Sequence, residues 1–434
     1  MNSAFREFHS DFTVRPAPLA NFRQRFQPGS NKEELMSGFI LALADLAMLG
    51  AAWLVGAALV GFVTGASIAD QAPLLLVLPL LALISAVQGL YPGYGLGSAE
   101  RIRRRWSASA SFFALLGLLC AALPVAGIGG ALVGITGLVY AAAIPLVETI
   151  IRLILKRRNL WGQKVILNGD AEAVAAYTKA LNAAPDLGLV PAPAGTIGAK
   201  PLATTTLPKA DDIGLQGLFP VPTRNQMAQP ARAIKRALDL AIGLIAGLCA
   251  LPLIAIFGAM IYAIDKGPIF YAQPRLGLNG RIVKTWKLRS MYQDSQARLD
   301  RHLAENAEAA AEWKQFFKLK RDPRILPKVG PFIRTFSIDE LPQIWNIICG
   351  ELSVVGPRIF PEYHMKAFSP EFQQLRLSVQ PGLTGLWQTS VRSEGDLVQQ
   401  ETLDRTYIRN WSLWLDIDMI YRTFGAVLGA KGAV

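Results

Sequence analysis

The chain has 434 residues, of which 52% are hydrophobic and 18% are charged. A soluble domain usually carries about 25% charged residues, so the composition excludes both an ordinary cytosolic enzyme and a disordered chain. The formal charge of +12 implies an anionic partner, and the scattered Cys120, Cys249 and Cys349 show neither a disulfide framework nor a zinc-ligand spacing.

Residues 1–34 are polar and of mixed charge, without the apolar core of a cleavable signal peptide, and are expected to be a cytoplasmic N-terminal segment. Residues 35–158 contain apolar runs that can each supply the roughly 20 residues of a spanning helix. The sequence therefore predicts a bundle of four transmembrane helices, near Leu35–Val63, Ala72–Tyr91, Ser107–Ala126 and Ile128–Leu155.

Basic residues predict how this bundle is oriented. The connection Pro92–Trp106 contains four arginines, and Lys156, Arg157 and Arg158 follow the last run, whereas the connection Thr64–Gln71 has no Lys or Arg. Basic loops remain in the cytoplasm, so both ends of the bundle should face it. Asp45 lies inside the first run and is either functional or, as we favour, hydrogen-bonded within the bundle.

Residues 159–230 begin like a dinucleotide-binding fold. Lys164–Asn168 is expected to be a strand, an alanine-rich helix runs to Ala184, and Leu187–Val190 is a second strand. Only Gly169 stands where a G-x-G-x-x-G turn would be needed, and residues 191–230 are loose. We predict a truncated Rossmann-like segment that acts as a spacer or interface and binds no dinucleotide.

A fifth apolar run, Ala237–Ile264, is long enough to span a membrane. Basic residues lie on both sides of it, which favours a cytoplasmic location for both flanks, and Pro252 removes a helix hydrogen bond near its middle. Residues 231–266 are therefore predicted to be a re-entrant membrane helix that breaks at Pro252. The alternative is a kinked spanning helix.

Residues 267–434 contain the chemistry-bearing motifs. Ile269–Gln273 and Ile282–Leu288 flank Asn279-Gly280, which predicts a β-hairpin, and Ser295–Lys320 should be a solvated helix. In Ser337-Ile338-Asp339-Glu340, Ser337 and Glu340 fit a capping box, which would make this only a helix start. The functional alternative is that Asp339 and Glu340 hold a divalent metal and supply a nucleophile.

Turns rich in Gly and Pro follow at Val355–Arg358 and Gln380–Gln388, and their Arg and Gln side chains suit a diphosphate and a nucleobase. With these residues, Ala233–Val434 resembles the bacterial sugar transferase family, the monotopic phosphoglycosyl transferases. The first half, at Gln88–Leu96 and the arginines after it, is similar to the long members. The other matching stretches are Gly267–Tyr271, Lys287–Met291, Ser337–Gln343 and Asn410–Asp416.

The resemblance implies a membrane α-helical protein with a mostly helical catalytic domain. It also implies transfer of a galactose- or glucose-type hexose 1-phosphate from a UDP-hexose to undecaprenyl phosphate, with release of UMP, as the first step of exopolysaccharide or O-antigen repeat assembly. Asp339 would be the nucleophile and Glu340 the ligand of a required Mg²⁺. The implied substrate-binding residues are Lys287, Arg289, Arg334, Arg358 and Gln388.

The chain departs from the family pattern at Ile359, where many members have Pro, at Val391, where a Gly is common, and in its short middle segment. The expected location is the bacterial inner membrane, with several spans and the catalytic domain on the cytoplasmic face. The expected partners are the lipid bilayer, both substrates and, as an open alternative, a second copy in a homodimer; nucleic acid is not expected, because no such motif is present. A non-enzymatic scaffold of polysaccharide assembly and a transporter are the competing interpretations.

Overall fold

The computed structural model describes residues 32–65, 77–122, 126–196, 199–204, 229–306, 308–310, 319, 322–390 and 397–428. The chain divides into two compact units, Met1–Pro220 and Val221–Val434, and each is described by itself.

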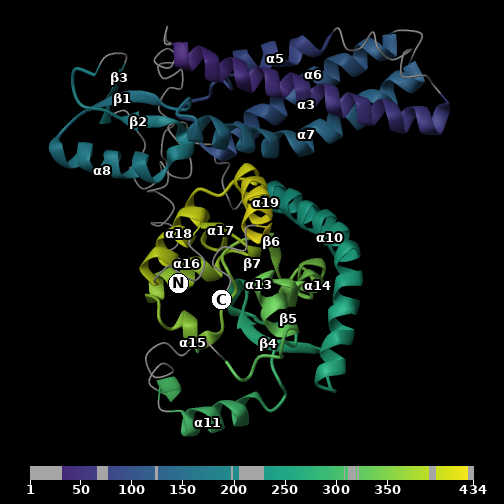
Figure 1. Ribbon diagram of the computed structural model, residues 1–434, viewed down its shortest axis with the longest axis vertical. Helices are drawn as coiled ribbons and strands as arrows, with labels where there is room; N and C mark the ends of the chain where they lie inside the picture. Colours follow the sequence, from purple (N-terminus) through teal and green to yellow (C-terminus); the bar gives the residue numbers. More distant parts are fainter. Residues whose placement is uncertain are drawn as a thin grey trace. The chain divides into compact units, whose positions relative to one another are not determined.

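The first unit contains a helical bundle, shown in the purple and blue part of Figure 1, in which α3 and α6 both pack on α7. Among the described residues of this unit, α3 and α7 are long and apolar enough to cross a membrane. The second predicted run appears as the shorter helix α5, and Leu49, Leu81, Phe112 and Tyr140 form much of the core. The helices are α3 (Lys32–Thr64), α5 (Leu78–Val87), α6 (Ser98–Ala122) and α7 (Ala126–Arg157).

The arginine cluster lies within helix α6, which begins at Ser98, so the prediction of a loop up to Trp106 is wrong. Pairing stabilises this helical turn, because Glu100 accepts from Arg103 and Arg104 at i+3 and i+4. The next residue, Arg105, is buried between Glu148 and Asp45. The interpretation of Asp45 as a hydrogen-bonding residue of the bundle is thereby confirmed.

The predicted Rossmann-like start is confirmed as a parallel sheet in the order β2-β1-β3, with α8 following β1. The strand β3 falls in the stretch that we expected to be loose. Its backbone is paired with β1, and such pairing between distant segments cannot be predicted from the local sequence. The elements are β1 (Gln163–Asn168), α8 (Ala171–Ala183), β2 (Leu189–Pro191) and β3 (Lys200–Ala203).

Thr204 covers the turn after β1, where dinucleotide-binding folds place a pyrophosphate. A Cβ atom added to Gly169 would lie 1.9 Å from Thr204 Oγ1, so the close approach of Thr204 requires a glycine at this position. The absence of dinucleotide binding stays a prediction, and the position of Thr204 supports it.

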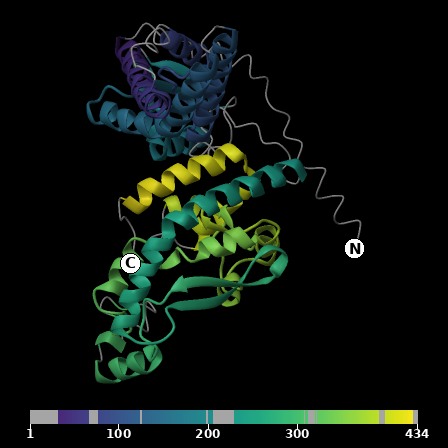
Figure 2. The ribbon, with the colours of Figure 1, turned by 90° about the vertical axis from the view of Figure 1, so that its right-hand side faces the viewer.

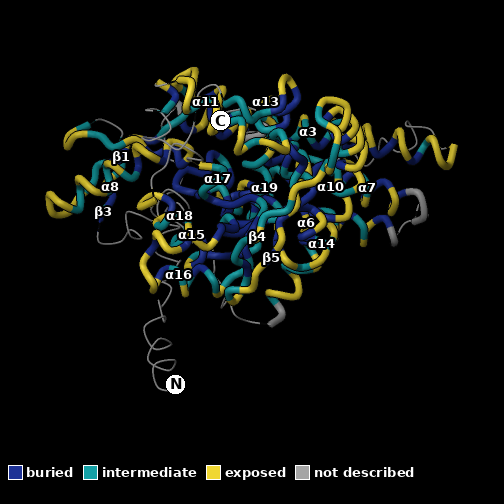
Figure 3. Tube along the Cα trace, turned by 90° about the horizontal axis from the view of Figure 1, so that it is seen from below, coloured by how far each residue is buried: buried dark blue, intermediate teal, exposed yellow. Residues whose placement is uncertain are grey.

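The second unit is built along helix α10 (Gln229–Ile264), which continues without interruption through Pro252. The helix bends along its length in Figures 1 and 2. The prediction that the helix breaks at Pro252 is therefore wrong. Proline removes one backbone hydrogen bond and displaces one carbonyl, while the other hydrogen bonds of the helix persist. Most of α10 is exposed, as Figure 3 shows, and it too is long and apolar enough to cross a membrane.

One face of α10 packs on its own unit from end to end. Near the start, Lys235 Nζ donates to the carbonyl of Val355 at 2.9 Å. Helix α14 (Gln343–Cys349) lies against the middle. Near the end, Ile261 is buried with Leu288 in one apolar cluster.

The predicted hairpin is confirmed, with β4 (Phe270–Leu276) and β5 (Ile282–Leu288) antiparallel and Phe270 opposite Leu288. The predicted helix at Ser295 is α11 (Ser295–Glu305), and most of residues 311–320 lie outside the described part. The rest is mostly helical, as predicted, with β6 and β7 paired in parallel. Its other elements are α13 (Val329–Thr335), the 3₁₀ turn η5 (Ile338–Glu340), β6 (Ser353–Val355), α15 (Glu362–Met365), α16 (Pro370–Leu377), β7 (Gly382–Thr384), α17 (Leu386–Ser390), α18 (Leu397–Arg409) and α19 (Leu413–Leu428).

Candidate active site

The two adjacent carboxylates lie on the short turn η5 between α13 and α14. Ser337 precedes the turn in the left-handed region, with φ at 55°, and its side chain makes no capping hydrogen bond. A capping residue needs extended backbone angles, so the capping-box interpretation is wrong. The left-handed residue instead turns the chain sharply between α13 and η5, which directs Asp339 and Glu340 toward the hairpin.

Two cations fix Glu340. Lys287 Nζ on β5 and Arg358 Nη2 after β6 both donate to Glu340 Oε1, at 2.6 and 2.7 Å. Lys287 Nζ lies 3.7 Å from Asp339 Oδ2. The structure thus brings together four of the residues that the sequence predicted, from three separate elements.

The two carboxylates differ in their ionisation. Burial alone would raise the pKa of Glu340, but the positive charges of Arg358 and Lys287 outweigh it and lower that pKa well below its usual range. Burial raises the pKa of Asp339, partly opposed by Lys287, and the charge of Glu340 raises it further. Asp339 is therefore the less firmly ionised group of the two.

The hydrogen-bond partners also distinguish the two groups. Asp339 is buried, with 12% of its side chain exposed, and accepts no hydrogen bond from a described residue. Both cations bind one oxygen of Glu340, and its Oε2 receives nothing from the described part of the chain. A carboxylate without hydrogen bonds can act as a nucleophile, and a neighbouring carboxylate that two cations keep ionised can act as a metal ligand.

The donor set fits Mg²⁺ better than a metal that needs an all-protein cage. Within the described ranges, no group of three or more His, Cys, Asp and Glu could enclose a metal. Mg²⁺ usually takes one or two carboxylates and completes its shell with water and substrate phosphates. Asp339 Oδ and Glu340 Oε2 can supply those carboxylate ligands.

The other predicted site residues separate into two groups. Arg334, in the last turn of α13, carries a charge that partly opposes the rise in the pKa of Asp339, which fits a place beside the site. Arg289 does not contact the carboxylates of η5: its guanidinium binds the carboxylate and the carbonyl of Asp265, just after α10. A nearly buried arginine needs such a partner, and its predicted role in substrate binding stays a prediction.

Gln388, on α17, lies against a close crossing of two backbone segments. Its Oε1 is 3.0 Å from where a Cβ atom of Gly385 would be, and the carbonyl of Gly356 is 2.2 Å from the same point. Both glycines are required at this crossing. The structure thus joins the two glycine turns that the sequence singled out, and Gln388 is part of that junction.

Sequence reasoning missed two arginines near Arg358. Arg275 on β4 donates to the carbonyl of Ile359 at 2.7 Å, and its charge interacts with those of Arg358 and Glu340. Arg376 on α16 is buried, pairs with Asp404 Oδ2 at 2.9 Å and donates to the carbonyl of Arg358. Isolated arginines in a strand and a short helix carry no signal that could have found them.

The same contacts account for one departure from the family pattern. Ile359 is buried in an apolar cluster with Val283, Ile347 and Leu352, so its side chain serves packing. Val391 lies outside the described residues.

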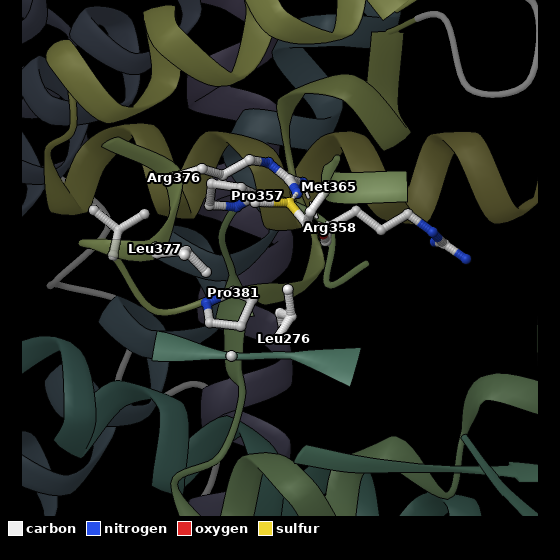
Figure 4. Close-up of a pocket in the computed structure, with 9 residues that line it drawn as sticks. Leu276, Pro357, Arg358, Met365, Arg376, Leu377 and Pro381 are labelled. Atoms are coloured by element: carbon white, nitrogen blue, oxygen red, sulfur yellow. Dashed lines mark hydrogen bonds between the residues drawn. The ribbon is translucent and has the colours of Figure 1, made fainter. Parts of the chain in front are cut away.

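A shallow pocket adjoins the loop that carries Arg358 (Figure 4). Arg358 is one of the lining residues, and its side chain extends away from the others. Arg376 and Met365 lie together at one wall, where Arg376 Nη1 approaches the sulfur at 3.3 Å. The remaining lining residues are Leu276, Gly277, Pro357, Leu377, Val379 and Pro381.

Comparison with known proteins points to one family. The model of the family described as "Bacterial sugar transferase" matches residues 230–430. "Undecaprenyl-phosphate galactose phosphotransferase" of Salmonella typhimurium is 37% identical over 209 residues, which cover 48% of this chain and 43% of that protein. "UDP-galactose-lipid carrier transferase" of Erwinia amylovora is 39% identical over 211 residues, or 49% of this chain and 44% of that protein.

A shorter relative is covered almost completely. "Exopolysaccharide production protein ExoY" of Sinorhizobium fredii is 35% identical over 216 residues, which are 50% of this chain and 95% of that protein. The chain thus spans less than half of the longer relatives' length but nearly all of this one. The matches cover about half of this chain, so the likeness of its first half to long members stays a prediction.

Proposed function

The chain belongs to the bacterial sugar transferase family, and from this premise we propose that it transfers a hexose 1-phosphate from a UDP-hexose to undecaprenyl phosphate and releases UMP. The observation that carries the proposal is the unequal pair of carboxylates. Glu340 is fixed by Lys287 and Arg358, and the buried Asp339 accepts no hydrogen bond from any described residue.

The reaction would proceed in two displacements at one phosphorus atom. An oxygen of ionised Asp339 attacks the sugar-bearing phosphorus of the UDP-hexose. The bond from that phosphorus to the bridging oxygen breaks, and UMP leaves with the electron pair. A phosphate oxygen of the lipid then attacks the same phosphorus and expels the Asp339 carboxylate. Both substrates thus react in turn with the enzyme, which predicts ping-pong kinetics.

Charge is the main obstacle to the first displacement, because a carboxylate and a diphosphate repel each other. Lys287 and Arg358 face the pair directly, and Arg334 acts on Asp339 from α13. These cations would offset the repulsion and stabilise the charge of the leaving UMP. Mg²⁺ held by Asp339 or Glu340 would supply further charge neutralisation at the diphosphate when bound.

The proposal is tested by incubating membranes that contain the protein with labelled UDP-glucose or UDP-galactose and undecaprenyl phosphate. A labelled lipid that carries a diphosphate-linked hexose is expected, with one UMP released for each lipid formed. Membranes without the protein are the control. If UDP or free hexose 1-phosphate is released and no lipid is labelled, the protein has another activity.

We infer that α10 does not cross the bilayer. Contacts with its own unit extend from Lys235 to Ile261, which is roughly 39 Å of helix. The hydrocarbon core is about 30 Å thick. If α10 spanned it, the charged unit packed along the helix would have to enter the membrane too. The helix would instead remain on the cytoplasmic side of the inner membrane with its apolar face in the lipid.

This inference predicts that Ala231→Cys and Lys284→Cys, on the two flanks of α10, are both labelled from the cytoplasm only. The native Cys120, Cys249 and Cys349 are first replaced by serine, and a membrane-impermeant thiol reagent is applied to intact cells and to inverted vesicles. Thr64→Cys, at the end of α3, should be labelled from the periplasm and serves as the control. Periplasmic labelling of Lys284→Cys would show that α10 spans the membrane.

A further inference from the structure

Three phenylalanine side chains form a continuous aromatic surface between the membrane helix and the turn that carries Asp339. Phe257 on α10 stacks on Phe332 of α13, with ring centroids 5.7 Å apart and planes 23° apart. Phe332 in turn contacts Phe336, with centroids 4.9 Å apart. Phe332 is 47% and Phe336 36% exposed, which is unusual for neighbouring aromatic residues. We call Phe257, Phe332 and Phe336 the aromatic ladder.

We propose that the aromatic ladder is the docking surface for the first isoprene units of the lipid acceptor, and this inference rests on the proposed function. An isoprenoid chain is apolar and carries methyl branches, and aromatic rings offer it a large, rigid contact area. A polyprenyl phosphate also needs cations for its head group. The ladder is an exposed apolar surface that leads from α10 toward such cations.

At its outer end the ladder is continuous with the lipid-facing surface of α10. Leu253, Ile256 and Met260 lie within one turn of Phe257, and all of them are exposed. The helix is apolar enough to enter a membrane. A lipid can therefore pass from the bilayer onto the ladder without leaving an apolar surface.

At its inner end the ladder reaches the reactive turn. Phe336 precedes Asp339 by three residues, so their Cα atoms are at most about 11 Å apart. Ile338 packs with Phe257 against one apolar cluster, which holds the turn beside α10. Arg334 lies between the two rings in sequence and acts on Asp339. A chain on the ladder would thus bring its phosphate to Arg334 and Lys287, next to the sugar phosphate on Asp339.

Assaying the two half-reactions separately distinguishes docking of the lipid acceptor from any other role of the phenylalanines. The full chain in lipid nanodiscs is assayed for exchange of labelled UMP into UDP-hexose without acceptor, and for transfer to undecaprenyl phosphate. In the double variant Phe332→Ala/Phe336→Ala, we expect KM for undecaprenyl phosphate to rise about tenfold or more while UMP exchange stays within twofold of wild type. Phe424→Ala, which removes a phenylalanine of 59% exposure on α19, should change neither.

Acceptors of different length give a second readout. Wild type should prefer undecaprenyl phosphate to a short polyprenyl phosphate, and the double variant should lose most of that preference. Phe332→Leu/Phe336→Leu keeps an apolar surface, so it should retain part of the preference even if the alanine variant folds poorly.

An unchanged KM and an unchanged length preference would overturn the docking surface. A parallel loss of exchange and transfer in the leucine variant would overturn it too, since the phenylalanines would then only support the fold or membrane attachment. If wild type itself neither exchanges UMP nor labels a lipid, the proposed function is what fails.

Discussion

Replacing Asp339 by asparagine is expected to abolish the exchange of labelled UMP into UDP-hexose in the absence of lipid acceptor. Exchange requires that the enzyme take up the sugar phosphate and return it to UMP, which only a covalent intermediate allows when no lipid is present. An amide is nearly isosteric with the carboxylate but is not a nucleophile. Loss of a nucleophile costs about 10⁴-fold or more in rate, so the variant should fall to the background of the assay.

The comparison variant is Asp294→Asn. Asp294 has an exposed carboxylate that pairs with Arg298 in the first turn of α11. It should exchange UMP at the wild-type rate. The covalent mechanism is wrong for this protein if wild-type exchange depends on undecaprenyl phosphate, or if Asp339→Asn keeps normal turnover.

The second large effect is expected at the buried ion pair between Arg376 and Asp404. Their side chains are only 5% and 2% exposed, and Arg376 also donates to the carbonyl of Arg358. Asp404→Asn would leave the guanidinium buried beside a neutral amide. Removal of one partner from a buried pair typically costs about 3–5 kcal/mol. We therefore expect a much lower thermal midpoint for the full chain in detergent, followed by circular dichroism.

The matched control is the exposed pair between Arg405 and Glu371, which joins the same two helices. Glu371 is 72% exposed, and its nearest contact with Arg405 is 3.3 Å. Exposed pairs contribute about 0–1 kcal/mol, so Glu371→Gln should shift the midpoint little. Equal shifts for Asp404→Asn and Glu371→Gln would contradict the importance of the buried pair.

A double variant separates stability from positioning. Arg376→Met/Asp404→Leu removes both charges and fills the space with apolar groups, which often restores the stability that a single substitution loses. The carbonyl of Arg358 nevertheless loses its donor. We expect the double variant to recover most of the thermal midpoint but to exchange UMP more slowly than wild type. Full recovery of both would show that Arg376 does not position Arg358.

The sequence by itself determined the features that depend on neighbouring residues. Apolar runs predicted α3 and α7, the alternation around Asn279-Gly280 predicted the hairpin, and strand and helix patterns predicted β1 and α8. The Asp339-Glu340 pair could be singled out because adjacent carboxylates near a helix start are a local pattern with a chemical meaning. These signals are read within a window of about ten to twenty residues.

Only the tertiary structure decided which charges meet. Lys287 and Glu340 are 53 residues apart and form a 2.6 Å contact, whereas Arg289, two residues from Lys287, binds Asp265 instead. Ser337 looked like a helix cap, yet its left-handed backbone places the carboxylates. Arg376 is invisible as a motif and still holds the backbone of Arg358. A buried charge takes whichever partner the fold brings within reach, because leaving it unpaired away from water costs several kcal/mol, and that choice depends on packing between distant segments.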